Sequence, residues 1–318
     1  MKAIVFSQSL AAALCFVAVQ SFAGPLQRAD VPDQPAWVVH IDCDGLRPTG
    51  LGRFLMAEME KPEPQAKFAA FQSIFSFDPR TQLHGLTLYS SGTASSDGVL
   101  LVYADFNPDR LVVLAKAAKE YQESTHKQYV IHSWIDAKRN RGGDSKARTY
   151  AAIHGGRVVV FGQMEERVGQ ALDVLDHTVP NLSTSAAFPT LGVVGASAFI
   201  QAAGRKLDLP ASNPNAAMFR MSKAMSVELG EAQGKVTASL VMEANDEEVA
   251  GHMTSIAQGL VALMKLQQDK PESVRLAESL SLKQDGARVL GSMEMPVDQV
   301  IELIKAHAAR KTATKQTQ

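Results

Sequence analysis

Short stretches of the chain alternate between hydrophobic and polar residues, and several of them run directly into segments with a helical pattern. Alternation at every second residue predicts strands at 37–42, 83–91, 129–136 and 219–229. Asn107-Pro108 marks the start of a helix whose apolar stripe comprises Leu111, Leu114, Ala115 and Ala118. A second helix is predicted after Asn245, with Glu248 placed for a capping box and an apolar stripe at Val249, Met253, Ile256, Leu260 and Leu263.

Two strand–helix segments resemble each other at a constant offset of 129 residues. GRVVVFGQMEERVGQALDVL (156–175) corresponds to GARVLGSMEMPVDQVIELI (286–304), and a glycine turn precedes the strand in each segment. Each half also contains an earlier strand followed by a helix, at 98–118 and at 234–253. The pattern predicts a duplicated unit of order β-α-β-β-α-β-β-α, whose second copy opens with a strand at 191–197.

This order of elements predicts an α+β protein built from two halves related to the ferredoxin-like arrangement. We expect a mostly antiparallel sheet with the helices packed on one face. The expected division is a signal peptide at 1–23, a first repeat at 24–180, a linker at 181–190, a second repeat at 191–310 and a disordered tail at 311–318. The order of elements leaves open whether the halves share one sheet.

The N-terminus has the pattern of a secretory signal peptide: Lys2, an apolar run from Ala3 to Val19, and the small-x-small site Ser21-Phe22-Ala23. A retained anchor is the alternative, but the run is shorter than the roughly 20 apolar residues of a spanning helix. We therefore expect a soluble periplasmic or secreted protein. Cleavage removes Lys2 from 32 basic residues against 33 acidic ones, which leaves a net charge near −2 and no field to attract nucleic acid.

Asp42-Cys43-Asp44-Gly45 follows an apolar strand and resembles the opening motif of haloacid-dehalogenase-type phosphatases. The resemblance implies Asp42 as nucleophile, Asp44 as acid/base and Mg²⁺ beside both. Leu46 and Pro48 depart from that motif, and the order of the hairpins differs from a doubly wound sheet. We interpret the acids as residues that shape a turn, with Asp44 as the helix cap and Cys43 as a buried small hydrophobic residue on the strand.

Two strands place histidine and aspartate on one face at every second position. The candidate binding residues are His40, Asp42 and Asp44 from the first strand and His132, Trp134 and Asp136 from the later one. If the strands meet, these side chains suit a divalent metal ion. The alternative is a solvated face whose side chains pair with their neighbours. The phenylalanines at 68, 71, 75 and 77 and Ile74 are either core residues or the lining of a ligand pocket.

Three segments resemble parts of exported bacterial proteins of no established activity: FDPRTQLHGLTLY (77–89), DFNPDRLVVLAK (105–116) and IHSWID (131–136). The resemblance covers most of the first half. It implies export and a shared scaffold, and it assigns no catalytic residue.

Together these observations favour an exported binding or scaffold protein of the cell envelope that is not an enzyme. The alternatives are a metal-dependent hydrolase that uses the His/Asp cluster of the first half, and a carrier of a small apolar molecule or lipid. No cofactor and no catalytic or metal-ligating residue is assigned. The expected partner is another envelope protein or a small apolar ligand, with no nucleic acid and no membrane span after signal cleavage.

Overall fold

The computed structural model describes residues 24–92, 94–135, 147–192, 198–205, 221–267 and 270–316. The predicted signal peptide at 1–23, Asp136 and most of the predicted strand at 191–197 lie outside these residues. No helix among them is long and apolar enough to cross a membrane.

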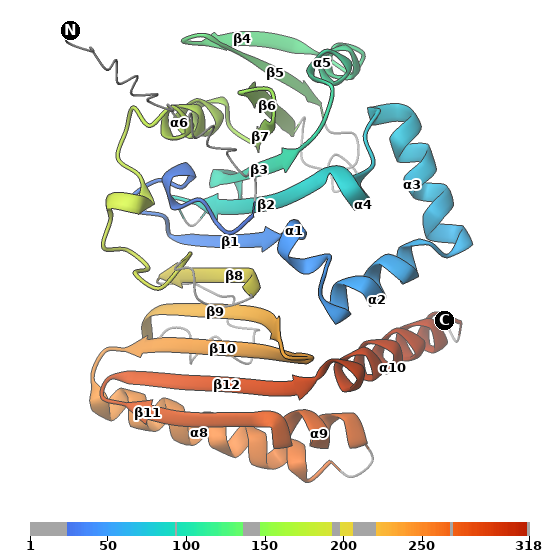
Figure 1. Ribbon diagram of the computed structural model, residues 1–318. Coiled ribbons are helices and arrows are strands. Elements are labelled where there is room, and N and C mark those ends of the chain that lie inside the picture. The colour runs from blue at the N-terminus through green and yellow to red at the C-terminus, as the bar shows by residue number, and fades with distance from the viewer. Residues whose placement is uncertain are drawn as a thin grey trace, which may run out of the picture.

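Twelve strands form one sheet (Figure 1). In chain order they are β1 Trp37–Asp42, β2 Leu83–Ser90, β3 Gly98–Ala104, β4 Gln122–His126, β5 Tyr129–Ile135, β6 Arg148–His154, β7 Val158–Gly162, β8 Ala198–Arg205, β9 Ser222–Ala232, β10 Lys235–Ala244, β11 Leu280–Asp285 and β12 Arg288–Pro296. All the strand pairs of the described residues are antiparallel.

The helices are α1 Cys43–Leu46, α2 Gly50–Met59, α3 Pro62–Phe75, α4 Pro79–Gln82, α5 Pro108–Lys116, α6 Glu165–Leu175, α8 Glu247–Lys265, α9 Pro271–Ser279 and α10 Val297–Gln316. The short 3₁₀ turns are η1 Arg28–Asp30, η2 Ser95–Asp97 and η4 Leu182–Thr184. The predicted α+β class is therefore confirmed. Helix α10 continues to Gln316, whereas a disordered tail was expected from residue 311.

The strand order across the sheet is β11-β12-β10-β9-β8-β1-β2-β3-β7-β6-β5-β4. The two halves meet where β1 pairs with β8, with Trp37 opposite Gly204. Outward from this seam, the first half runs β1-β2-β3-β7-β6 and the second runs β8-β9-β10-β12-β11, each in the same relative chain order. Strands β4 and β5 add an edge to the first half, where the sequence predicted one extra strand.

The structure refines single elements of the predicted order. The first strand of the second half in the described chain is β8, Ala198–Arg205, and residues 193–197 of the strand predicted at 191–197 lie outside the described residues. Helix α8 is capped by Asp246, whose Oδ1 accepts a hydrogen bond from the Val249 amide at 2.8 Å, instead of by Asn245. The cap of α5 is the predicted Asn107, which accepts from the Arg110 amide at 3.1 Å.

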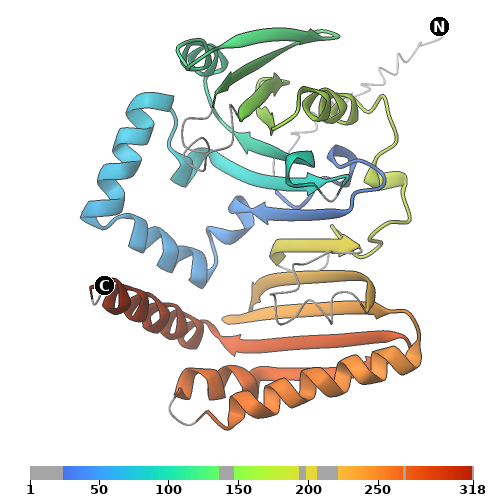
Figure 2. The ribbon, with the colours of Figure 1, turned by 180° about the vertical axis from the view of Figure 1, so that it is seen from behind.

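The helices lie on both faces of the sheet, not on one. Along β7, Val160 packs with Leu172 of α6 in the main core, while the next residue, Phe161, faces α5 on the opposite side. In the second half, α8 runs along β11 and β12, as the view from behind shows (Figure 2). Its Met253 lies in a separate core with Met242 and Val289.

The predicted linker is held in place by the N-terminal segment of the described chain. The Arg28 guanidinium donates hydrogen bonds to the carbonyl oxygens of Leu182, Phe188 and Leu191 at 2.7–2.8 Å. Because one side chain bonds three carbonyls of this segment, Arg28 organises the chain between the halves.

Candidate functional site

The two acids of the Asp-x-Asp turn have separate structural roles. Strand β1 ends at Asp42, which is buried and caps α1: its Oδ1 accepts a hydrogen bond from the Gly45 amide at 2.7 Å. Asp44 lies inside α1, so it does not share the strand face as predicted, and the cap is Asp42. Cys43 is the first residue of α1 and is only half-buried. Its pKa is raised chiefly by burial, which keeps the thiol protonated at neutral pH.

His40, the histidine of β1, is buried, with 2% of its surface exposed. Its Nδ1 lies 2.9 Å from the Thr87 hydroxyl and its Nε2 lies 3.2 Å from the Gly24 carbonyl oxygen. Burial lowers the pKa of His40, although the Gly24 contact and Asp42 act in the opposite direction. The ring is thus used to attach the N-terminal segment to β1 and β2.

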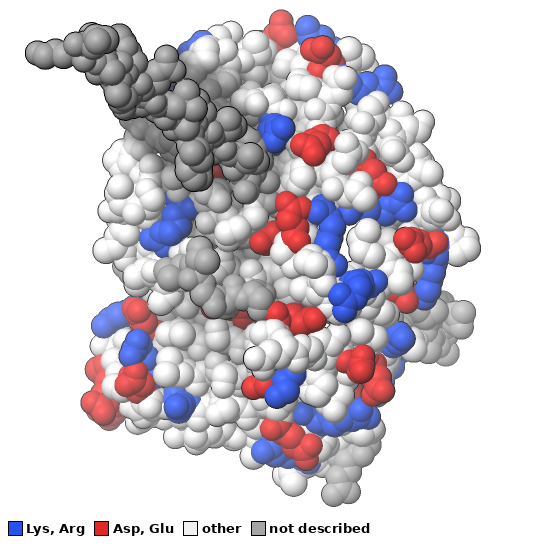
Figure 3. Space-filling model, in the orientation of Figure 1, with Lys and Arg blue, Asp and Glu red and all other residues white. Residues whose placement is uncertain are grey.

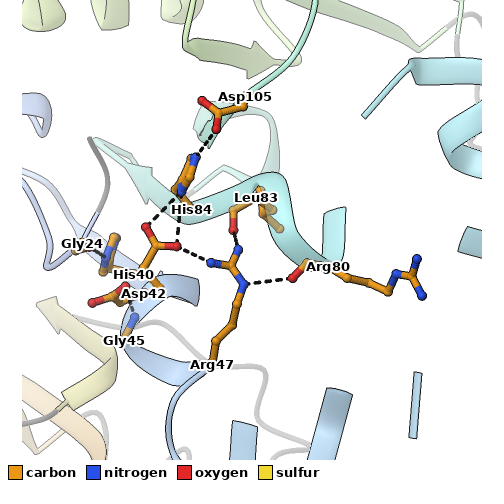
Figure 4. A network of polar contacts seen from close by, with 10 residues as sticks. Gly24, His40, Asp42, Gly45, Arg47, Arg80, Leu83, His84 and Asp105 are labelled. Carbon is orange, nitrogen blue, oxygen red and sulfur yellow. Dashed lines mark hydrogen bonds and ion pairs between the residues drawn. The ribbon is translucent and has the colours of Figure 1, made fainter. Parts of the chain in front are cut away.

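A polar network connects α1 to the ends of β2 and β3 (Figure 4). His84 lies between two carboxylates, with Nδ1 3.0 Å from Asp44 Oδ2 and Nε2 3.0 Å from Asp105 Oδ2. Arg47 donates to Asp44, to the Leu83 carbonyl and, at 2.9 Å, to the Arg80 carbonyl. The network ties three segments together, so its side chains are occupied as structural groups.

The second set of predicted residues lies far from the first. The register from β1 through β2, β3, β7 and β6 to β5 places His132 on the opposite face from His40. Five strand spacings of about 4.8 Å separate β1 from β5, or about 24 Å. Asp136 lies outside the described residues. In the described part of the chain, no group of three or more His, Cys, Asp and Glu side chains could hold a metal ion.

His132 and Trp134 instead line a cavity of about 320 Å³ between α5 and the sheet. The remaining lining residues are aliphatic or phenylalanine: Phe75, Leu111, Val112, Leu114, Ala115, Ala118, Ala151, Ala152, Ile153, Val159 and Phe161. The lining includes the four predicted stripe positions, of which Leu111, Leu114 and Ala115 lie in α5 and Ala118 lies just after it. Phe75 belongs to the predicted aromatic cluster. The cavity is therefore an apolar chamber with one imidazole and one indole in its wall.

The polar side of this cavity is a short chain of hydrogen bonds. His132, which is 8% exposed, contacts the Tyr121 hydroxyl through Nδ1 at 2.7 Å. Tyr121 in turn donates its proton to Glu123 Oε2 at 2.7 Å. Burial lowers the pKa of His132 and raises the pKa of Tyr121 to about 12, so both are neutral at neutral pH. The hydrogen bond from Tyr121 lowers the pKa of Glu123, which stays ionised.

Charged residues do not gather into a patch of one sign on the face seen in Figure 3. Acidic and basic side chains are interspersed over the described part of that face. The local features that stand out in the described structure are therefore the apolar cavity at His132 and the polar contacts of His40 and His84.

Comparisons with known proteins identify only distant structural neighbours. No family model matches the chain, and no curated protein matches it. Crystal form III of TP0453 is 9% identical, with a TM-score of 0.48, over 89% of this chain and 98% of that chain. Crystal form I is 7% identical, with a TM-score of 0.46, over 88% and 96% of the two chains. As the sequence indicated, the chain matches no characterised family.

The sequence did not indicate that three further polar residues lie close together. His84, Asp105 and Arg47 come from separate segments, so no local pattern marks their network. The cavity had a partial signal, because the α5 stripe contains alanine where longer side chains would fill a helix–sheet interface.

Proposed function

We propose that this chain is an exported binding protein that holds a small apolar molecule in the cavity between α5 and strands β5, β6 and β7. One observation carries the proposal: the cavity wall is apolar apart from His132 and Trp134. Binding sites for small molecules are concave, mostly apolar and contain few polar groups, with volumes of roughly 300–1,000 Å³. The cavity lies at the lower end of that range.

The sequence of the wall supports a role for the empty volume. Ala115 and Ala118 of the α5 segment face Ala151 of β6, so small side chains meet from both sides. A void in a folded interior loses packing contacts and reduces stability. Occupation by an apolar ligand would restore those contacts.

The location of the protein is part of the proposal. The signal-peptide pattern at 1–23 supports a periplasmic or secreted protein. Its ligand would then be an apolar molecule of the cell envelope or of the surroundings.

A scaffold role is the second candidate, and α8 provides the observation that favours it. Apolar side chains lie exposed along one stripe of this helix and the turn after it: Ile256, Leu260, Leu263 and Leu266. Exposed apolar stripes of this kind occur at interaction surfaces. A Leu260→Lys substitution that abolishes co-purification of an envelope protein, while ligand binding persists, would favour the scaffold role.

We also propose that the two halves arose by duplication of one unit. The matching strand order on either side of the β1–β8 seam and the repeated segment at an offset of 129 residues support this origin. Under this proposal the ligand cavity belongs to the first copy, where β4 and β5 extend the sheet.

Binding of an apolar fluorescent probe, N-phenylnaphthylamine, tests the proposed site. Ala115→Phe fills the cavity from α5 and should weaken probe binding at least about tenfold. Val113→Phe is the matched control, because Val113 lies on the same helix with 58% of its surface exposed and is expected to leave binding unchanged. Equal binding by both variants would contradict the site. Native mass spectrometry of protein purified from its host would show whether a molecule leaves on denaturation.

A further inference from the structure

The two nitrogens of His132 have different surroundings. Nδ1 is engaged by the Tyr121 hydroxyl, whereas Nε2 has no hydrogen-bond partner among the described residues. The side chain is more than nine-tenths buried and lines the cavity. Nε2 is therefore the ring nitrogen of His132 that is free to bond a molecule in the cavity.

The direction of the hydrogen-bond chain determines which proton His132 carries. A tyrosine hydroxyl has a single proton, and Tyr121 donates it to the Glu123 carboxylate. Its oxygen must therefore accept from His132, which requires the imidazole proton to be on Nδ1. In a neutral imidazole the other nitrogen then has only a lone pair. Nε2 is consequently a hydrogen-bond acceptor.

We propose that the cavity selects apolar molecules that carry a hydroxyl group, whose O–H donates to His132 Nε2. This inference rests on the proposed function and specifies the ligand class of the same site. A carboxylate with an apolar chain as long as that of the alcohol has no proton to donate, and it would bring an uncompensated charge into the cavity. Trp134 lines the same cavity, and its indole N–H has no partner in the described chain, so it can serve as a donor for the hydroxyl oxygen.

The volume limits the size of the apolar part. An apolar protein cavity of about 150 Å³ accommodates benzene. The cavity of about 320 Å³ in this protein is about twice as large, so it suits roughly a dozen heavy atoms. Medium-chain alcohols fit this estimate, and longer molecules would extend through the open side of the cavity.

Displacement of the fluorescent probe by three matched compounds tests the inference on the whole protein at pH values near 8. Decanol carries a hydroxyl, its methyl ether lacks the donor proton, and decanoate is an anion. Decanol should displace the probe at roughly tenfold lower concentration than the methyl ether, the usual contribution of one well-placed hydrogen bond. Decanoate should be the weakest competitor.

Substitution of His132 tests whether this side chain causes the preference for decanol over its methyl ether. In His132→Phe, decanol and its ether should displace the probe at the same concentration. Tyr121→Phe removes the group that orients the imidazole and should reduce the difference. Tyr129→Phe is the matched control, because the Tyr129 hydroxyl is engaged by Asp176 at 2.6 Å and should leave the preference intact.

The outcomes separate this inference from the proposed function. If the probe binds but decanol and its ether compete equally in the wild-type protein, the hydroxyl preference is wrong and the apolar site remains. If neither the probe nor any of the three compounds binds, both proposals fail. The wild-type series decides the question even if His132→Phe does not fold.

Discussion

Helices α5 and α8 occupy corresponding places in the two halves, since each follows the third strand counted outward from the β1–β8 seam. They contact the sheet with side chains of very different size. Under α5, alanines at 115, 118 and 151 leave a cavity of about 320 Å³. Under α8, methionines at 221, 225, 242 and 253 pack into a core.

The difference shows that the same arrangement of helix and sheet can form either a core or a chamber. Methionine is flexible and fills irregular gaps, whereas alanine ends at Cβ and cannot. The two interfaces also differ in polarity, because His132 and Trp134 line the cavity on the α5 side, whereas apolar side chains form the methionine core. Changing the size of side chains in the α5 or the α8 interface should therefore alter the difference between them.

The largest expected effect is from opening a hole in the filled interface. Met253 is 0% exposed, and Met253→Ala should lower the free energy of unfolding by about 2–5 kcal/mol. Urea denaturation measures this change. Ile256→Ala, on the same helix at 47% exposure, is the control and should cost much less. Equal losses in the two variants would show that α8 does not pack as described.

A second comparison places the same substitution in both interfaces. Ala151→Val adds volume on the cavity side and should raise the free energy of unfolding by about 0.5–1 kcal/mol, as cavity-filling changes commonly do. Ala244→Val adds volume to the methionine core, where Ala244 is buried, and should lower it by about 1–3 kcal/mol. Chemical denaturation of both variants measures the two signs. Changes of the same sign would remove the contrast between the interfaces.

The smallest expected effect is a dependence of the free energy of unfolding on pH, which arises from His132 at the α5 cavity. Burial lowers the pKa of His132 below 6.5; Glu123 opposes this shift and Lys116 adds to it. Because the unfolded chain then binds a proton that the folded chain does not, stability should fall as pH decreases below 6.5. His40 acts in the same direction, again because it is buried.

Denaturation of the wild-type protein and His132→Phe at pH values near 7.5 and 5.5 tests this dependence. The variant should lose less stability on acidification than the wild type, with the remainder due to His40. An unchanged pH dependence in His132→Phe would mean that the imidazole is not held in its neutral form.

The strands and their hairpins were predictable because local rules determine them. The strand at 37–42 is β1 at the predicted bounds, and Gly155, Gly156 and Gly286 adopt the positive φ angles of tight turns. The union of both halves in one sheet was not predictable. It depends on the pairing of Ile41 with Ile200, residues that no local pattern connects.

The site was predictable only in its components. The alternation in IHSWID correctly placed His132 and Trp134 on one face, and the helical period placed Leu114 and Ala115 on the stripe that faces them. The void between the two sets depends on how closely α5 approaches β6, which is a property of the packed structure. The grouping of His40 with His132 failed because four strands lie between β1 and β5 and the rings occupy opposite faces.

Anomalous X-ray scattering from a crystal of the protein with a bromine-labelled medium-chain alcohol would show directly whether the cavity holds the ligand. We expect a bromine peak between α5 and strands β5–β7, with the hydroxyl at His132 Nε2. A bromine peak only along the exposed stripe of α8, or no ordered peak at a concentration that displaces the probe, would contradict it.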